Sequence, residues 1–319
     1  MLLKFQMQLK AIFTRRKKKR LAPKMKLPGK KIYGLVFLCL LIAGIIEAQA
    51  AVVRVFVTIA PQKYFVEKIG GGLVNVSVLV PTGANPHTYE PKPRQMVDLS
   101  KSALYFAVGI DLEKSWLKKI TGTNFRLRII RTDEGIEKIT ITGHSHNHSG
   151  EKLNRRNEAP DPHIWLSPKL VRIQAGHIKE ALIAADPQNQ AGYEERYGLF
   201  LQEIDELDAE LTELFAAGKN KRFLTFHPSW GYFARDYGLI QVPIEMEGKE
   251  PKPAQLQRLV SQASRQGIKV VFVQPQLSDK SAALIAQAVK GEIIHVDPLA
   301  ENWTDNLRKT GRLFVNSMK

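Results

Sequence analysis

Four side chains in this sequence share a setting that suits a metal ligand. His87, His163 and His227 each lie in a proline-containing segment beside an expected strand or helix. Asp297 is placed in the same way, directly after the apolar run 293–296 and before a proline. Three imidazoles and one carboxylate in four-coordinate geometry match Zn²⁺, whereas more carboxylates would favour Mn²⁺. The four residues form no compact motif, and each alone is compatible with a structural role. Together they predict one metal site.

A second group of histidines alternates along a polar stretch. His144, His146 and His148 are separated by single polar residues, and histidines in a flexible loop can bind divalent cations weakly. Because a loop that becomes ordered on binding has a lower affinity than a preformed site, these residues are expected to form a secondary metal loop. A solvated loop with incidental histidines explains the pattern equally well. His177, in an expected helix, and His295, in an expected strand, are interpreted as structural.

The cysteine content limits the remaining ligand chemistry. The only cysteine, Cys39, lies in an apolar run near the N-terminus that we expect to be removed. The mature chain is then expected to have neither a disulfide nor a thiolate metal site, so that any metal is bound by His, Asp, Glu or water. Glu90 and Asp161 lie close in sequence to expected ligands. We expect them to accept the second ring hydrogen of a ligating histidine.

Two series of short apolar strands alternate with helices and are expected to position these ligands. Near-continuous apolar strands of this kind predict parallel sheets that are covered on both faces. Ligands of open α/β sheets bind beyond the carboxyl ends of the strands, which is where the four expected ligands lie. The expected strands are 52–58, 74–80, 104–108 and 126–130 in the first series, and 222–226, 240–244, 269–273 and 293–296 in the second.

A long helix is expected between the two series. Apolar residues recur at spacings of three to five along it, which predicts one buried stripe made of Leu199, Ile204, Leu207, Leu211 and Leu214. The prediction is therefore an α/β protein of two lobes joined by one long rigid helix, each lobe a parallel sheet with flanking helices. The expected ranges are 51–185 for the N-terminal lobe with a His-rich loop at 142–160, 186–217 for the connecting helix, and 218–319 for the C-terminal lobe.

Residues 1–50 have the layout of a secretory signal peptide. The basic stretch Arg15–Arg20 precedes the apolar run Ile32–Ile46, and a small-x-small pattern then predicts cleavage after Ala50. The run is shorter than the roughly 20 residues of a spanning helix, although an uncleaved anchor is the alternative. Translation from Met25 would give a leader of ordinary length, and we expect Met25 to be the true start. The mature protein is expected in the periplasm.

The charge distribution argues against a nucleic-acid partner. The formal net charge is +16, but residues 1–50 hold 12 of the 47 basic residues and a single acidic one. The remainder is only mildly basic, which requires no polyanionic partner. An apolar content of 44% is typical of a globular protein.

On these residues the chain resembles the metal-specific solute-binding proteins of bacterial ABC transporters, and is most similar to their zinc branch, the ZnuA type. The resemblance spans about 52–319. It is carried by specific segments rather than by overall composition, and these are Ile69–Gly71, Val80–Pro91, Asp161–Leu166, His227–Phe233, Glu247–Pro251 and Asp297–Leu299.

The resemblance implies a metal ion bound between two α/β lobes, with ligands at His87, His163 and His227. Relatives that carry manganese tend to have Glu at the third position, so His227 favours Zn²⁺. A His-rich loop before the second ligand is also typical of zinc members, although here it is short. Relatives supply the fourth ligand from a C-terminal Asp, a loop carboxylate or water, and Asp297 matches the first of these.

The implied function is non-enzymatic: capture of Zn²⁺ in the periplasm and its delivery to the membrane permease of an ABC transporter, by a protein expected to be monomeric. Affinity is expected to fall as pH drops through the histidine range, and the rigid helix to limit lobe movement. The alternatives are a manganese-binding member of the same family, or a periplasmic metal buffer or adhesin. A zinc hydrolase would need an open coordination position, which Asp297 as a ligand would close.

Overall fold

The fold is known from a computed structural model that describes residues 52–122, 124–141, 160–217, 221–245, 252–277 and 279–318. The chain separates into two units at Ala50, and the second, Ala51–Lys319, contains all the described residues. The expected signal peptide and the loop histidines His144, His146 and His148 lie outside the described residues. None of the helices that the structure describes combines the length and apolar character needed to cross a bilayer.

The two series of strands form two four-stranded sheets in which every pairing is parallel, as predicted. The order is β2-β1-β3-β4 in the N-terminal lobe and β6-β5-β7-β8 in the C-terminal lobe, so the two lobes share one topology. The inner strands are β1, β3, β5 and β7. Of these, β3 and β7 are buried throughout, because helices cover both of their faces. The strands are β1 Val53–Val57, β2 Val74–Val78, β3 Leu104–Ala107, β4 Arg128–Arg131, β5 Arg222–Thr225, β6 Ile240–Pro243, β7 Val270–Val273 and β8 Glu292–His295.

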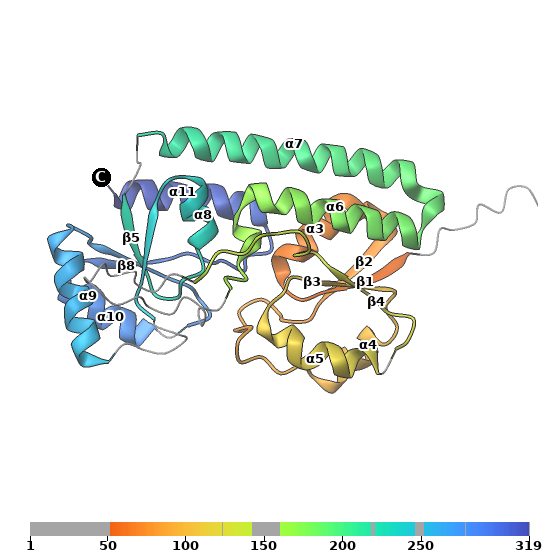
Figure 1. The fold of residues 1–319 in the computed structure, drawn as a ribbon, viewed down its shortest axis with the longest axis horizontal. Coiled ribbons are helices and arrows are strands. Elements are labelled where there is room, and N and C mark those ends of the chain that lie inside the picture. Colours follow the sequence, from red (N-terminus) through yellow and green to blue (C-terminus); the bar gives the residue numbers. More distant parts are fainter. Residues whose placement is uncertain are drawn as a thin grey trace, which may run out of the picture. The chain divides into compact units, whose positions relative to one another are not determined.

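Alternate residues of the inner strands point to opposite faces, and this divides the helices into two layers (Figure 1). Val55 and Phe223 belong to one large core, whereas their neighbours Phe56 and Leu224 belong to two smaller clusters on the other faces. The back layer, which packs on the large core, consists of α3 Ala60–Gly70, α6 Pro168–Ala185, α7 Gln190–Phe215, α8 Gly231–Asp236 and α11 Trp303–Ser317. The front layer consists of α4 Pro93–Leu99, α5 Asp111–Thr121, α9 Pro253–Arg265 and α10 Asp279–Ala288.

The helix α7 joins the lobes, as predicted, but its buried stripe differs from the expected one. Leu199 is 58% exposed, whereas Phe200 is 1% exposed and faces the core. The spacing of three to five residues was satisfied by either position, and adjacent residues of a helix differ by about 100° in direction. The actual stripe is Tyr193, Phe200, Ile204, Leu207, Leu211 and Phe215.

A single core runs through both lobes along α7. Phe200 lies against Phe65 of the N-terminal lobe, with 5.8 Å between ring centroids, and Phe65 lies 5.2 Å from the ring of Trp303 of the C-terminal lobe. Farther along the helix, Phe215 packs on Phe233 at 5.7 Å. Because the lobes share these contacts, the back layer resists a wide change in the angle between them.

A polar cluster, here called the back clamp, strengthens this connection. It consists of Tyr64 and Lys68 on α3, Glu203 on α7 and Thr304 on α11. The Glu203 carboxylate accepts hydrogen bonds from Tyr64, from Lys68 at 2.5 Å and from Thr304 at 2.6 Å. Burial by itself would raise the pKa of Glu203, but these three donors outweigh it and lower the pKa. The ionised carboxylate therefore ties three helices from both lobes to one point.

Candidate metal centre

Three histidines from distant parts of the sequence converge between the lobes. One ring nitrogen from each of His87, His163 and His227 lies within 4.8 Å of the other two. The ring of His227 is central, with centroids 5.0 Å from that of His87 and 5.2 Å from that of His163. Nitrogens that share one tetrahedral Zn²⁺ are about 3.4 Å apart, since each Zn–N bond is about 2.0–2.1 Å long. A small inward shift of the rings is therefore enough to bind one ion.

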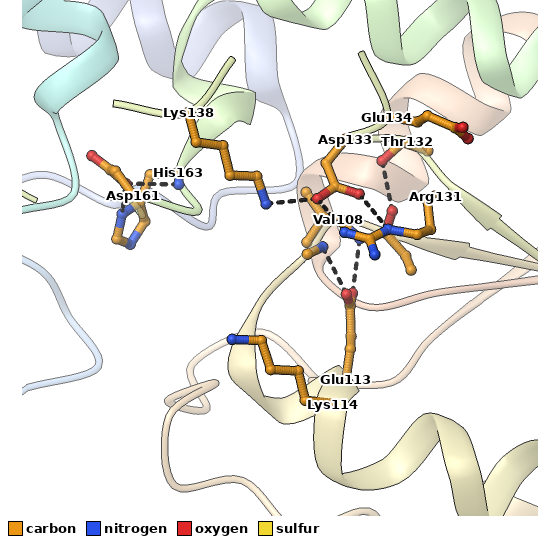
Figure 2. A network of polar contacts seen from close by, with 12 residues as sticks. Val108, Glu113, Lys114, Arg131, Thr132, Asp133, Glu134, Lys138, Asp161 and His163 are labelled. Atoms are coloured by element: carbon orange, nitrogen blue, oxygen red, sulfur yellow. Dashed lines mark hydrogen bonds and ion pairs between the residues drawn. The ribbon is translucent and has the colours of Figure 1, made fainter. Parts of the chain in front are cut away.

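His163 is held by the carboxylate that precedes it. Asp161 Oδ1 accepts from the backbone N–H of His163 at 2.9 Å and lies 2.7 Å from the ring Nδ1, as Figure 2 shows. His163 is 5% exposed, and burial lowers its pKa despite the opposing effect of Asp161. With Nδ1 donating to Asp161, the neutral ring presents Nε2 as the free lone pair.

His227 follows β5 and is held in a similar way. Its Nδ1 lies 2.6 Å from Oε2 of Glu245, and the two side chains are 10% and 13% exposed. Its other nitrogen, Nε2, is buried and has no hydrogen-bond partner in the described part of the chain. A buried ring nitrogen without a partner is costly, and coordination of a cation would satisfy it.

His87 is the exposed member of the three. It lies on the segment between β2 and α4, where Asn85 Oδ1 accepts from the His87 backbone N–H at 2.9 Å. Partial burial of the ring, followed by the imidazoles of His227 and His163, lowers the pKa of His87 to about 4. The ring is therefore neutral near pH 7, which is the state that a metal ligand requires.

Both lobes contribute to the wall of the cavity beside these rings, here called the histidine cleft. Its lining includes His87, Ile110 and Leu112 from the N-terminal lobe and Gln274 and Leu299 from the C-terminal lobe. The lining also includes Trp165, whose ring lies 5.2 Å from that of His163. Trp165 Nε1 donates to the backbone carbonyl of Pro298 at 2.7 Å. This bond fixes the C-terminal wall relative to the segment that carries His163.

Buried polar groups position the N-terminal wall (Figure 2). Glu113, in the first turn of α5, accepts from the backbone N–H groups of Val108 at 2.8 Å and Gly109 at 2.7 Å. Gly109 has φ +89°, and a Cβ there would collide with the Asp133 carboxylate, so glycine is required. Asp133 also pairs with Lys138 at 2.6 Å. These contacts fix the turn from which α5 enters the cleft.

Residues 55–317 match the family described as zinc-uptake complex component A, periplasmic. The chain belongs to this family. The match spans both lobes and all three histidines, so the geometry described above is that of a member of the zinc-uptake component A family. Its members are metal-binding solute-binding components of ABC uptake systems.

Solved structures and curated relatives agree with this assignment. A crystal structure of ZnuA is similar with a TM-score of 0.78 and 40% identity, covering 84% of this chain and 99% of that one. A ZnuA deletion mutant with zinc bound has a TM-score of 0.77 and 40% identity, covering 84% and 98%. The high-affinity zinc uptake system protein ZnuA of Bacillus subtilis is 26% identical over 259 residues, covering 79% of this chain and 81% of the relative.

In this member of the family, Asp297 stands apart from the three histidines. Among the described residues, the group that gathers within 4.8 Å contains only the histidines. Asp297 Oδ1 instead accepts from Gln276 Nε2 at 2.8 Å and from the Leu299 backbone N–H at 2.9 Å. Asp297 nevertheless precedes Pro298 and Leu299, which line the cleft, so it lies at the edge of the site.

The two predicted supporting carboxylates differ in placement. Asp161 is bonded to His163 as described, whereas Glu90 is exposed and has no hydrogen bond to His87 in the part of the chain that the structure describes. Glu245, the partner of His227, was not among the residues expected from the sequence. It lies just beyond β6, which pairs with β5, and its N–H donates to the Phe226 carbonyl at 2.9 Å. The rule that ligands gather at strand ends would have found it.

Proposed function

We propose that this protein captures Zn²⁺ in the periplasm and delivers it to the membrane permease of an ABC transporter. The observation that carries the proposal is the convergence of three imidazoles, two of which are oriented by largely buried carboxylates. Membership of the zinc-uptake component A family supports the same conclusion. So does a similar protein, 40% identical, whose structure contains zinc.

The donor set favours Zn²⁺ over Mn²⁺. Neutral imidazole nitrogens suit zinc, whereas carboxylate, carbonyl and water oxygens suit manganese. Asp161 and Glu245 are engaged with the Nδ1 atoms of His163 and His227, so they act on the ion through these rings. A fourth position remains for water or for Asp297, which would have to leave its bond to Gln276.

In this proposal His163 and His227 form the fixed part of the site, and His87 completes it. The fixed pair is buried and held by carboxylates, so an ion that reaches it meets two oriented lone pairs. His87 lies on an exposed segment without such support, and its movement can enclose or free the ion. Because the lobes share one core along α7, release at the permease depends on this segment more than on a wide hinge.

The arrangement does not favour a zinc hydrolase. Such an enzyme needs a general base positioned to take a proton from metal-bound water. The two carboxylates bonded to the rings, Asp161 and Glu245, already accept from His163 and His227. Their geometry therefore serves ligand orientation and not proton transfer.

Calorimetric titration of residues 51–319 with Zn²⁺ and with Mn²⁺ tests this function. Replacing His163 or His227 by Ala removes a direct ligand and should weaken Zn²⁺ binding more than about 100-fold, beyond the 10–100-fold typical of supporting residues. His87→Ala should weaken it as well, and Asp297→Ala reports whether Asp297 is the fourth ligand. Unchanged Zn²⁺ binding by His227→Ala, or tighter binding of Mn²⁺ than of Zn²⁺ by the unaltered chain, would contradict the proposal.

A further inference from the structure

The front of the molecule is basic by sequence, whereas α7 on the back is acidic. Residues 92–122 and 252–292, which contain the front helices, hold 12 basic and five acidic residues by sequence. Residues 190–215, which form α7 in the back layer, hold eight acidic residues and one basic residue. Figure 1 shows α7 along one long side of the molecule and α4, α5, α9 and α10 along the other. The modest charge of the whole lobe region therefore combines a basic front with one acidic helix, α7, while the other back helices hold nine basic and four acidic residues.

Neighbouring helices neutralise part of the acidic charge of α7. Glu203 pairs with Lys68, Asp205 pairs with Arg172, and Glu210 pairs with Arg308 on α11. These partners all belong to the back layer, so the pairing lowers the field on that side of the molecule.

The cations of the front layer are left largely unpaired. In the described part of that layer, Lys114 is the one cation with a carboxylate partner, Asp111. The other described cations of residues 92–122 and 252–292, on the front helices and the loops beside them, are exposed and have no ion pair among the described residues, and they are Lys92, Arg94, Lys101, Lys118, Lys119, Lys252, Arg258, Arg265, Lys269 and Lys290. The front layer therefore presents a net positive field to solvent.

Exposed apolar side chains accompany these cations. Phe125, just after α5, is 90% exposed, and Val97 on α4 and Leu284 on α10 are 53% and 62% exposed. The Arg126 guanidinium lies 5.5 Å from the centroid of the Phe125 ring. Cations interleaved with exposed aromatic and aliphatic groups suit the boundary between lipid head groups and acyl chains, where both kinds of side chain are satisfied.

The histidine cleft is accessible from the same side. His87 is the exposed member of the three histidines and leads directly into the front helix α4. The front helix α5 begins at Asp111, which lines the cleft. His163, by contrast, is buried and leads into the back helix α6. The exposed part of the histidine cleft therefore lies on the segments that lead into the front helices.

From these observations we propose that the front layer docks on an anionic lipid surface and thereby turns the histidine cleft toward the membrane. Each basic residue held near an anionic surface strengthens binding about fivefold, so several acting together give reversible attachment at moderate salt. The acidic α7 would be repelled, which selects the orientation. Binding to lipid does not require the metal ion. Only the idea that this binding assists delivery of the ion rests on the proposed function.

Vesicle sedimentation of residues 51–319 tests the proposal. This part of the chain is one compact unit, and it lacks the apolar run that would bind lipid by itself. Binding is measured to vesicles of phosphatidylglycerol and phosphatidylcholine in about equal parts and to phosphatidylcholine alone, at ~50 and ~200 mM salt. We expect binding to the anionic vesicles only, and weaker binding at the higher salt.

Two triple variants with the same change in charge distinguish an effect of the front face from an effect of the net charge of the protein. Lys118→Glu, Lys119→Glu and Arg126→Glu together alter the front. Lys169→Glu, Lys309→Glu and Arg312→Glu alter exposed positions of α6 and α11 on the back. The front variant should bind at least tenfold more weakly, and the back variant should stay within about twofold of the unaltered protein.

The outcomes that overturn the proposal are distinct. Absence of binding of the unaltered protein to anionic vesicles overturns it. If the front variant then still slows zinc uptake by cells, the partner of the basic face is an acidic protein and not a lipid surface. Equal losses in both triple variants also overturn it, since net charge alone would explain them. Zn²⁺ titration of the front variant should match the unaltered protein. Failure of Zn²⁺ binding in the unaltered chain would count against the proposed function and leave the lipid result standing.

Discussion

The three histidines are held in two different ways. On one side, His163 and His227 are nearly buried, and each has a carboxylate oxygen within 2.7 Å of its Nδ1. On the other side, His87 is exposed, and its ring has no carboxylate partner in the described part of the chain. In the proposed function, this difference lets one site bind an ion tightly and still release it, because two ligands are oriented before the ion arrives and the third can adjust.

The largest expected effect concerns the proton affinity of His87, the exposed histidine. Partial burial and the rings of His227 and His163 lower its pKa to about 4, whereas an unfolded histidine titrates near 6.5. Between these values the unfolded chain holds a proton that the folded chain does not. Acidification from pH 6.5 to 4 therefore destabilises the metal-free fold at this residue, and above pH 6.5 His87 has no effect.

Proton NMR of the metal-free protein checks this value, and we expect the titration midpoint of His87 near pH 4. This corresponds to proton binding more than a hundredfold weaker than that of an unfolded histidine. In His227→Ala the midpoint should rise toward 6.5, because that ring contributes to the lowering. A midpoint near 6.5 in the unaltered protein would contradict the description of the site. The competition between protons and Zn²⁺ at His87 thus lies below the ordinary histidine range.

Removal of either supporting carboxylate should have the next largest effect. Asp161→Ala and Glu245→Ala free the rings of His163 and His227 to rotate and to change tautomer, so Zn²⁺ affinity should fall about 10–100-fold. Competition with a chelator of known affinity measures this. Asp161→Asn and Glu245→Gln retain the shape but weaken the charge-assisted bond, and should lie between the unaltered protein and the Ala variants. If both Ala variants bind Zn²⁺ as tightly as the unaltered protein, the carboxylate partners do not distinguish His163 and His227 from His87.

A matched change beside His87 should have a much smaller effect. Asn85→Ala removes the side-chain acceptor for the His87 backbone N–H but leaves the ring free to move as before. Loss of one exposed hydrogen bond is worth about 1 kcal/mol or less, so affinity should change by less than about fivefold, with a faster release of Zn²⁺ in stopped-flow chelation. A loss as large as that of Asp161→Ala would mean that His87 is as firmly fixed as the other two.

The sequence predicted the sheets, and it singled out the three histidines that the structure brings together, because both depend on local patterns. Apolar runs mark the strands, and polar residues directly after them mark the edge where ligands gather. The pairing among those polar residues depends on which strands become neighbours. Glu245 meets His227 because β6 pairs with β5, and Gln276 meets Asp297 because β7 pairs with β8. A single sequence does not specify these neighbours.

The back clamp and the buried face of α7 were beyond sequence reasoning for a related reason. Glu203 is 139 residues from Tyr64 and 101 from Thr304, and nothing near any of them in the sequence indicates their contact. On α7, Leu199 and Phe200 are both apolar, and only the packed core shows that Phe200 is the buried one. Long-range contacts of this kind select among locally equivalent patterns.

The shared core has a consequence for the order in which the chain can reach its final state. Phe65 lies near the start of the described chain, and its ring meets Trp303, in the last helix. The packing of the first lobe is therefore complete only when the last helix is in place. Helices α3 and α6 can cover one part of the apolar face of α7 before that, but the part that packs on α11 stays uncovered until α11 has formed.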